Sequence, residues 1–140
     1  MTALYIESSA ILAWLLGEPQ ARTVIDAVTR AQTVMTSVLS IVEVERALNR
    51  AERSRLLSAG QSQTLHGLME RAKSGWIRME ISEEVRSRAG QKFPIEPIRT
   101  LDAIHLATAL IFMRAFPDLQ MLSFDSRIRR NAQPLGISIL

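Results

Sequence analysis

Four acidic residues stand in apolar surroundings, where an unpaired carboxylate is costly. Glu7 and Asp125 each come directly after a short apolar run that is typical of a buried parallel strand, and Glu43 and Asp102 lie within apolar helical patterns. Carboxylates gathered at one sheet edge repel each other and lose hydration, and a divalent cation removes that penalty. Oxygen ligands without cysteine favour Mg²⁺ or Mn²⁺ over zinc. The four acids therefore predict a metal site suited to phosphate esters.

Each acid also has a purely structural explanation. Asp102 is placed to interact with the dipole of a helix capped by Thr100, and Asp125 is placed to cap the helix that follows it. Glu7 is explained equally well as a loop acid at the end of a strand. Glu43 has three candidate partners on its own helix, through a capping box or an ion pair: Ser40, Arg46 and Arg50.

Short apolar segments alternate with longer segments of helical periodicity. Strands are predicted at residues 3–6, 33–36, 76–81, 120–124 and 137–140. Helices are predicted at residues 9–16, 21–30, 38–53 after a Ser37 cap, 58–73, 82–91, 101–116 after a Thr100 cap and 126–132. This alternation predicts an α/β fold with a parallel sheet covered by helices on both faces. Glu7 and Asp125 then lie at carboxyl ends of strands, the edge at which open α/β sheets bind ligands.

The composition is that of an ordinary globular domain, with 47% hydrophobic and 22% charged residues over 140 positions. We therefore expect a single domain spanning residues 1–140. No cysteine is present, so disulfides and a cysteine nucleophile are excluded. The longest apolar run, residues 10–16, is too short for a membrane span and lacks the flanks of a signal peptide. A cytoplasmic protein without membrane contact is expected, and the net charge of +3 permits a nucleic-acid partner.

Four segments resemble the successive motifs of the PIN domain family: YIESSA at residues 5–10, VEVERAL at 42–48, LDAIHLA at 101–107 and SFD at 123–125. The best match is the small stand-alone type that serves as toxin in VapBC toxin–antitoxin pairs. The resemblance implies a five-stranded parallel sheet between helices and an Mg²⁺- or Mn²⁺-dependent endoribonuclease that cleaves single-stranded RNA. It further implies a homodimer that is inhibited by a VapB-like antitoxin.

The resemblance also implies roles for individual residues. Glu43, Asp102 and Asp125 match the second, third and fourth family acids, and Ser9 and Ser123 match hydroxyl residues beside the first and fourth. Glu7 departs from the family, which has Asp as the central metal ligand. The extra methylene displaces the carboxylate by roughly 1.5 Å, and Mg²⁺ tolerates little geometric error. Glu7 is compatible with natural variation, an attenuated enzyme or an introduced substitution.

Two other classes of protein are alternatives to a nuclease. A receiver-type signalling domain needs adjacent acids after the first strand and a lysine after the last long strand, and neither is present. A catalytically silent PIN-like binding module is supported by Glu7. His105 is interpreted as a helix-packing residue, with a proton-carrying role as the alternative. The arginines after Asp125 are interpreted either as a solvated face or as contacts to an RNA backbone: Arg127, Arg129 and Arg130.

Overall fold

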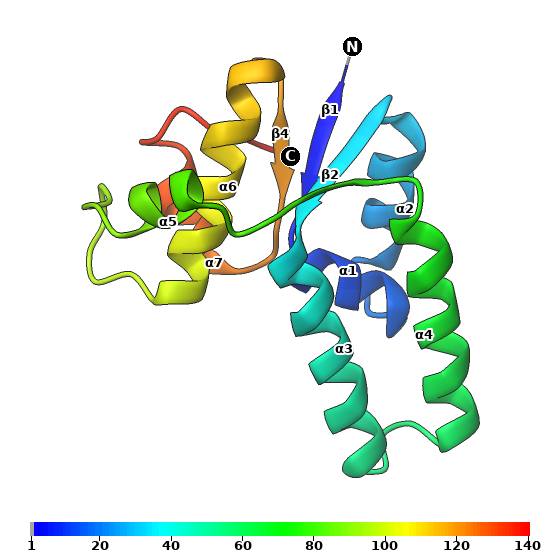
Figure 1. The fold of residues 1–140 in the computed structure, drawn as a ribbon. Coiled ribbons are helices and arrows are strands. Elements are labelled where there is room, and N and C mark those ends of the chain that lie inside the picture. The colour runs from blue at the N-terminus through cyan, green and yellow to red at the C-terminus, as the bar shows by residue number, and fades with distance from the viewer. Residues whose placement is uncertain (1) are drawn as a thin grey trace.

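A five-stranded parallel sheet forms the centre of the protein, and its central strands are drawn as arrows in Figure 1. A computed structural model describes residues 2–140. The strand order is β3-β2-β1-β4-β5, and every pairing between neighbours is parallel. The strands span Ala3–Ile6 (β1), Thr33–Ser37 (β2), Ile77–Met79 (β3), Gln120–Leu122 (β4) and Ser138–Ile139 (β5). The predicted α/β class with a five-stranded parallel sheet between helices is confirmed.

Helices cover both faces of this sheet, as Figure 1 shows. The helices on one face are α1 (Ser8–Leu15), α2 (Ala21–Arg30), α3 (Val38–Arg53) and α4 (Ala59–Lys73). The helices on the other face are α5 (Glu83–Ala89), α6 (Thr100–Ala115) and α7 (Ser126–Ala132). Among the helices of residues 2–140, none has the length and hydropathy needed to cross a membrane.

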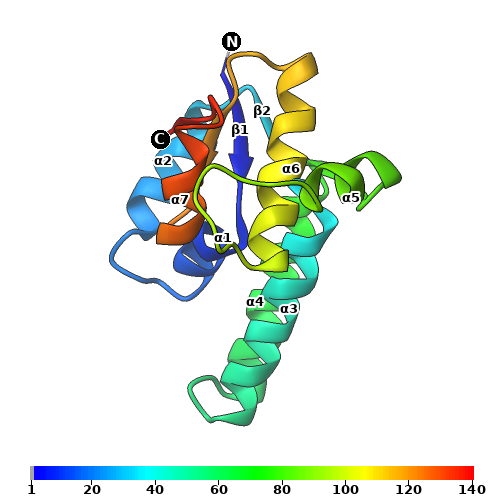
Figure 2. The same cartoon turned by 90° about the vertical axis from the view of Figure 1, so that its left-hand side faces the viewer.

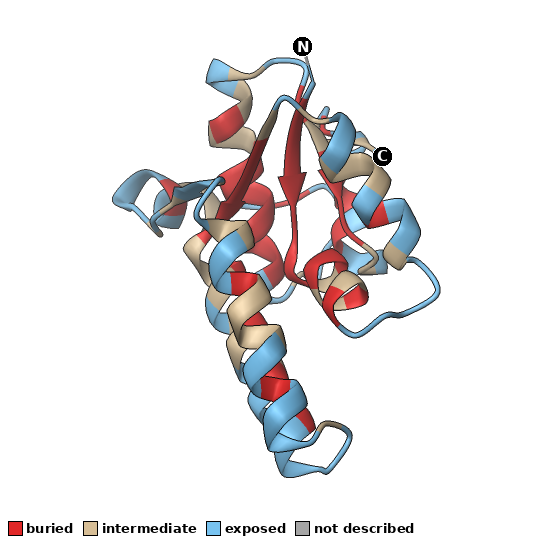
Figure 3. Ribbon diagram, turned by 90° about the vertical axis from the view of Figure 1, so that its right-hand side faces the viewer, coloured by how far each residue is buried: buried red, intermediate tan, exposed pale blue. Residues whose placement is uncertain are grey.

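Side chains of β1 alternate between two separate cores. Leu4 and Ile6 pack with α1–α4, whereas Ala3 and Tyr5 pack with α5–α7. This alternation follows from the two-residue period of a strand, and both sides of a parallel sheet are apolar for the same reason. Burial of one large apolar side chain contributes about 1.5–3 kcal/mol, so β1 is fixed from both faces. The red strands in Figure 3 show this burial.

Helices α3 and α4 extend beyond the sheet as a two-helix arm (Figure 2). Leu48 and Ala51 of α3 and Met69 of α4 are buried along the inside of the arm. Leu56, in the connection between the two helices, is 79% exposed. The apolar residues of α3 therefore pack on the sheet near the start of the helix and on α4 further along it.

Most predicted boundaries agree with the structure within a few residues. The third, fourth and fifth strands are shorter than predicted, whereas the second is one residue longer. The prediction that Thr100 caps α6 is wrong: Thr100 is the first helical residue, and Arg99 occupies the N-cap position without a side-chain capping bond. Ser37 caps α3 as predicted, accepting a hydrogen bond from Leu39 N.

Candidate active site

The strand order reverses between β1 and β4, and the candidate site lies at their carboxyl ends. Strands β2 and β3 lie on one side of β1, and β4 and β5 lie on the other. The last residues of β1 and β4, Ile6 and Leu122, are paired, and Glu7 N donates to Leu122 O at 3.0 Å. A crevice forms at such a reversal because the flanking connections leave in opposite directions. Glu7 and Asp125 follow these two strands directly.

A cleft of about 410 Å³ opens at this edge. All four acids predicted from the sequence line it: Glu7, Glu43, Asp102 and Asp125. They come from the N-cap of α1, the middle of α3, the first turn of α6 and the N-cap of α7. The remaining lining residues are Ser8, Ser9, Leu12, Arg99, Thr100 and Leu101. Four elements that are distant in sequence thus bring their acids to one place.

Glu7 is the most enclosed acid of the cleft, with 3% of its surface exposed. Its Oε2 accepts hydrogen bonds from the Ser8 hydroxyl at 2.5 Å and from Ser9 N at 3.1 Å. Its Oε1 accepts from the hydroxyls of Ser9 at 2.5 Å and Ser123 at 2.6 Å. A carboxylate offers about four lone-pair positions, so these contacts occupy its whole accepting capacity. A cation that binds Glu7 directly must displace one of them.

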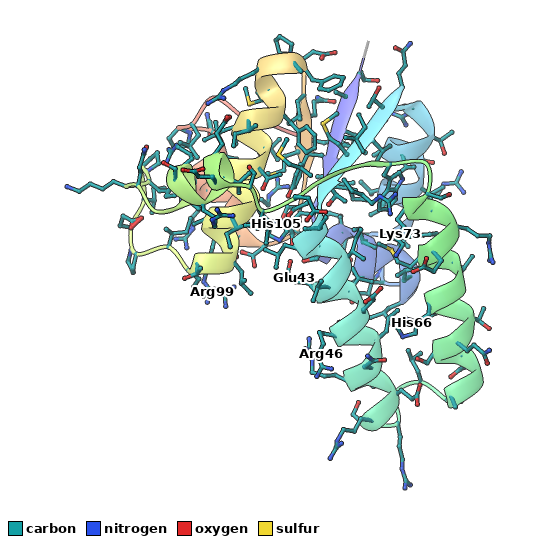
Figure 4. The ribbon with its side chains drawn as sticks, in the orientation of Figure 1. Glu43, Arg46, His66, Lys73, Arg99 and His105 are labelled. Atoms are coloured by element: carbon teal, nitrogen blue, oxygen red, sulfur yellow. The ribbon has the colours of Figure 1, made fainter. Side chains whose placement is uncertain are left out.

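Glu43 is held by a buried histidine. His105 Nε2 lies 2.6 Å from Glu43 Oε1, and His105 Nδ1 lies 2.8 Å from the Tyr5 hydroxyl. Burial, reinforced by the negative charge of Glu7, raises the pKa of Tyr5 well above its ordinary value. Because a carboxylate only accepts, the Nε2 proton of His105 points to Glu43, and Nδ1 of the neutral imidazole accepts from the Tyr5 hydroxyl. Figure 4 shows Glu43 and His105 at the facing sides of α3 and α6.

Asp102 and Asp125 share one arginine. Arg99 Nε donates to Asp102 Oδ2 at 3.2 Å, and Arg99 Nη2 lies 3.6 Å from Asp125 Oδ2. The bond to Asp102 and the charges of both aspartates raise the pKa of the Arg99 guanidinium. The Arg99 side chain is 60% exposed, whereas that of Asp102 is 6% exposed. The guanidinium thus covers the two carboxylates from the solvent side.

The structural explanations for the acids hold to different extents. Asp125 does cap α7, because its Oδ1 accepts from Arg127 N at 2.8 Å and from Ile128 N at 3.4 Å. Asp102 lies in the first turn of α6, and Glu7 caps α1. The local partners predicted for Glu43 are replaced by His105, from a helix 62 residues away. Capping leaves the second oxygen of Asp125 facing the cleft, so the structural and chemical explanations are compatible.

The sequence did not predict the roles of two residues of the site, His105 and Arg99. His105 lies three residues after Asp102 on α6, and this spacing places the two on neighbouring parts of one helical face. Arg99 precedes α6 by one residue. Its spacing of three residues from Asp102 is the feature of the sequence that could have indicated their ion pair. All three arginines of the basic cluster are exposed, and Arg129 donates to Ser123 O at 3.0 Å.

The chemistry of the donor set fits a hard divalent cation. Every anionic group in the cleft is a carboxylate, and Mg²⁺ and Mn²⁺ prefer such oxygen ligands. Ligand atoms of Glu7, Glu43 and His105 also lie within 4.8 Å of one another. The Nε2 proton of His105 is directed at Glu43, so the imidazole acts there as a donor and the carboxylates remain the candidate ligands.

Residues 4–134 match the model of the PIN domain family. Ribonuclease VapC46 of Mycobacterium tuberculosis is 33% identical over 141 aligned positions, which cover 100% of this chain and 98% of the relative. Ribonuclease VapC35 of the same species is 28% identical over 96% of this chain and 84% of its own length. The chain therefore belongs to the PIN domain family, in its VapC type.

Solved structures share the fold at low sequence identity. VapBC2 from Rickettsia felis, crystallised with a DNA fragment from its promoter, aligns with a TM-score of 0.68 and 9% identity over 99% of this chain and 97% of that chain. VapC20 of M. tuberculosis, described as a toxin that cleaves the sarcin–ricin loop, aligns with a TM-score of 0.66 and 16% identity over 91% and 93%. At these identities the likeness concerns the fold.

Proposed function

We propose that this protein is an Mg²⁺- or Mn²⁺-dependent endoribonuclease that cleaves single-stranded RNA as the toxin of a toxin–antitoxin pair. The observation that carries the proposal is the convergence of four carboxylates from four elements on one cleft at the strand-order reversal. The names of the relatives support the reaction class, since two VapC relatives are called ribonucleases.

Asp102, Asp125, Glu43 and Glu7 would hold the cation in this proposal. When bound, such a cation supplies Lewis-acid stabilisation of the charge that develops on the phosphate and lowers the pKa of nearby water. Asp102 and Asp125 offer oxygens at the open side of the cleft, where Arg99 now lies. Glu7 would contribute its negative charge from the buried side of the cleft, where three serine hydroxyls donate to its carboxylate.

Glu43 is the residue best placed to orient the attacking water. Its side chain is 26% exposed, against 6% for Asp102, and one of its oxygens is fixed by His105. As water attacks phosphorus in line, a new P–O bond forms and Glu43 accepts a proton of the water, while the bond to the leaving ribose oxygen breaks and that oxygen takes a proton from the solvent. His105 positions Glu43 in this scheme, and Tyr5 fixes the orientation of the imidazole.

Removal of divalent cations is expected to stop cleavage. The purified protein should cut single-stranded RNA in Mg²⁺ or Mn²⁺, and EDTA in excess should reduce the rate to background, because the clustered carboxylates need a cation to approach a phosphate. Gel analysis of a labelled oligonucleotide measures this, with metal added back after EDTA as the control. Unchanged cleavage in EDTA would contradict the metal-dependent mechanism. Absence of cleavage in both metals would favour the silent binding module.

We further propose that the protein is cytoplasmic, forms a homodimer and binds a VapB-like antitoxin. Structural neighbours include VapBC complexes, which supports an antitoxin partner. Helix α1 buries most of its apolar surface, because α2, α3 and α4 pack around it. Leu16 after α1 and Val42 on α3 remain 39% and 54% exposed. These two side chains are the apolar surface that we assign to the dimer contact.

A charge at Val42 is expected to weaken the dimer. Sedimentation at tens of micromolar should show a dimer for the wild type, and Val42→Arg should raise the dissociation constant at least about tenfold, since a loss of ~1.4 kcal/mol is sufficient. Leu56→Arg is the matched control, because Leu56 lies at the far end of the α3–α4 arm. A monomeric wild type at this concentration would contradict the dimer.

A further inference from the structure

Arg99 occupies the solvent side of two carboxylates that the proposed function assigns to the cation. Its guanidinium spans Asp102 at 3.2 Å and Asp125 at 3.6 Å, through two different nitrogens. Asp102 comes from α6 and Asp125 from the N-cap of α7, so Arg99 links two elements. The bridge neutralises part of the repulsion between the two acids.

A divalent cation at this site and the guanidinium would compete for the same two carboxylates. Both are positive, and Oδ2 of Asp102 and of Asp125 are the atoms directed at Arg99. We therefore propose that Arg99 is an exchangeable counter-ion of the metal site: it bridges Asp102 and Asp125 in the metal-free protein and is released toward an RNA phosphate when the cation binds. This inference rests on the proposed function and adds a residue and a regulatory step to it.

The position of Arg99 allows such an exchange. Its side chain is 60% exposed and borders the same cleft, so it leaves the carboxylates by rotation about its own side-chain bonds. Its backbone stays fixed as the N-cap residue of α6. A planar guanidinium matches two oxygens of a phosphate. Once released, Arg99 lies at the rim of the cleft as a ready phosphate contact, beside the residues that hold the cation.

The exchange predicts opposite effects of one substitution on metal and RNA. If the bridged form makes up about 90% of the metal-free protein, it weakens the apparent metal affinity about tenfold. Arg99→Gln should therefore tighten the binding of Mn²⁺ alone by about three- to tenfold. The same variant should raise KM for single-stranded RNA, because a phosphate contact is lost. A purely structural role for Arg99 would not move these two quantities in opposite directions.

Calorimetric titration with Mn²⁺, without RNA, is the first measurement. Arg99→Lys keeps the charge but not the planar fork, so it separates a bridge from a general field effect: intermediate affinity is expected for a bridge and wild-type affinity for a field effect. Arg46→Gln is the matched control, because Arg46 is exposed and lies on α3 one turn beyond Glu43, toward the far end of the α3–α4 arm (Figure 4). Its Mn²⁺ affinity should equal that of the wild type.

The outcomes separate this inference from the proposed function. Equal Mn²⁺ affinity of the wild type and Arg99→Gln, with metal-dependent cleavage intact, would overturn the exchange and leave the nuclease in place. Tighter Mn²⁺ binding with an unchanged KM would overturn the release of Arg99 to phosphate. If neither protein binds Mn²⁺, the metal site itself is wrong and the exchange is wrong with it.

Discussion

Replacement of Asp102 by asparagine is expected to reduce RNA cleavage by about 1,000-fold, or about 4 kcal/mol at the transition state. Asp102 is the acid whose side chain combines near-complete burial with an oxygen directed at the open side of the cleft. Asparagine keeps the volume and one acceptor but removes the charge that a cation requires. Rates with a labelled single-stranded RNA in Mg²⁺ and in Mn²⁺ measure the loss.

The stability of the same variant distinguishes a metal ligand from a helix-dipole partner. Loss of a favourable charge in the first turn of α6 lowers the free energy of unfolding by roughly 0.3–1 kcal/mol, and relief of repulsion between the acids offsets this. We expect the unfolding midpoint in EDTA to change little. Asp26→Asn is the matched control: Asp26 also pairs with an arginine on a helix, Arg22 at 3.2 Å, but lies on α2. Full activity of Asp102→Asn would return Asp102 to a structural role.

The position of the acids at the strand ends was predictable, because each acid directly follows an apolar run of strand length. Apolar runs of strand length identify β1 and β4, and Glu7 and Asp125 follow them in the sequence. In a parallel sheet all such positions lie at one edge. The adjacency of β1 and β4 is a long-range property that the apolar runs do not encode, and the structure supplies it.

The partners of the acids were harder to predict. For Glu43 the sequence offers arginines on the same helix, but an exposed ion pair of that kind contributes little. His105, buried and already bonded to Tyr5, gives a shorter and better shielded contact. Arg99 was missed because a solvent-exposed arginine has many possible partners, and only the fold brings Asp125 beside Asp102.

The saturation of Glu7 depends on side-chain reach and could not be read from spacing. Three serine hydroxyls from two segments of the chain converge on its carboxylate: Ser8, Ser9 and Ser123. The resemblance placed Ser9 beside the first acid and Ser123 beside the fourth, and the structure brings both hydroxyls to Glu7. That a glutamate fills its accepting capacity with them is a finding of the structure, and it gives the departure from aspartate a physical meaning.

Shortening Glu7 to aspartate is expected to raise the cleavage rate in Mg²⁺ about tenfold, which corresponds to ~1.4 kcal/mol at the transition state. An aspartate remains an effective N-cap for α1, but it lacks one methylene and cannot reach all three serine hydroxyls. An oxygen is then available to a cation. The gain should be smaller in Mn²⁺, which tolerates looser geometry. Glu18→Asp, an identical change at an exposed glutamate after α1, is the control.

Glu7→Gln tests the charge at constant length. The amide fits the same space and the serine hydroxyls can rotate to suit it, so the fold should persist, as circular dichroism would show. Cleavage should nevertheless fall to background in both metals, because the most enclosed negative charge of the cleft is gone. A loss of activity in Glu7→Asp would mean that the backbone is adapted to glutamate and that the displaced carboxylate is the functional one. Unchanged activity in both variants would remove Glu7 from the metal site and leave it as the cap of α1.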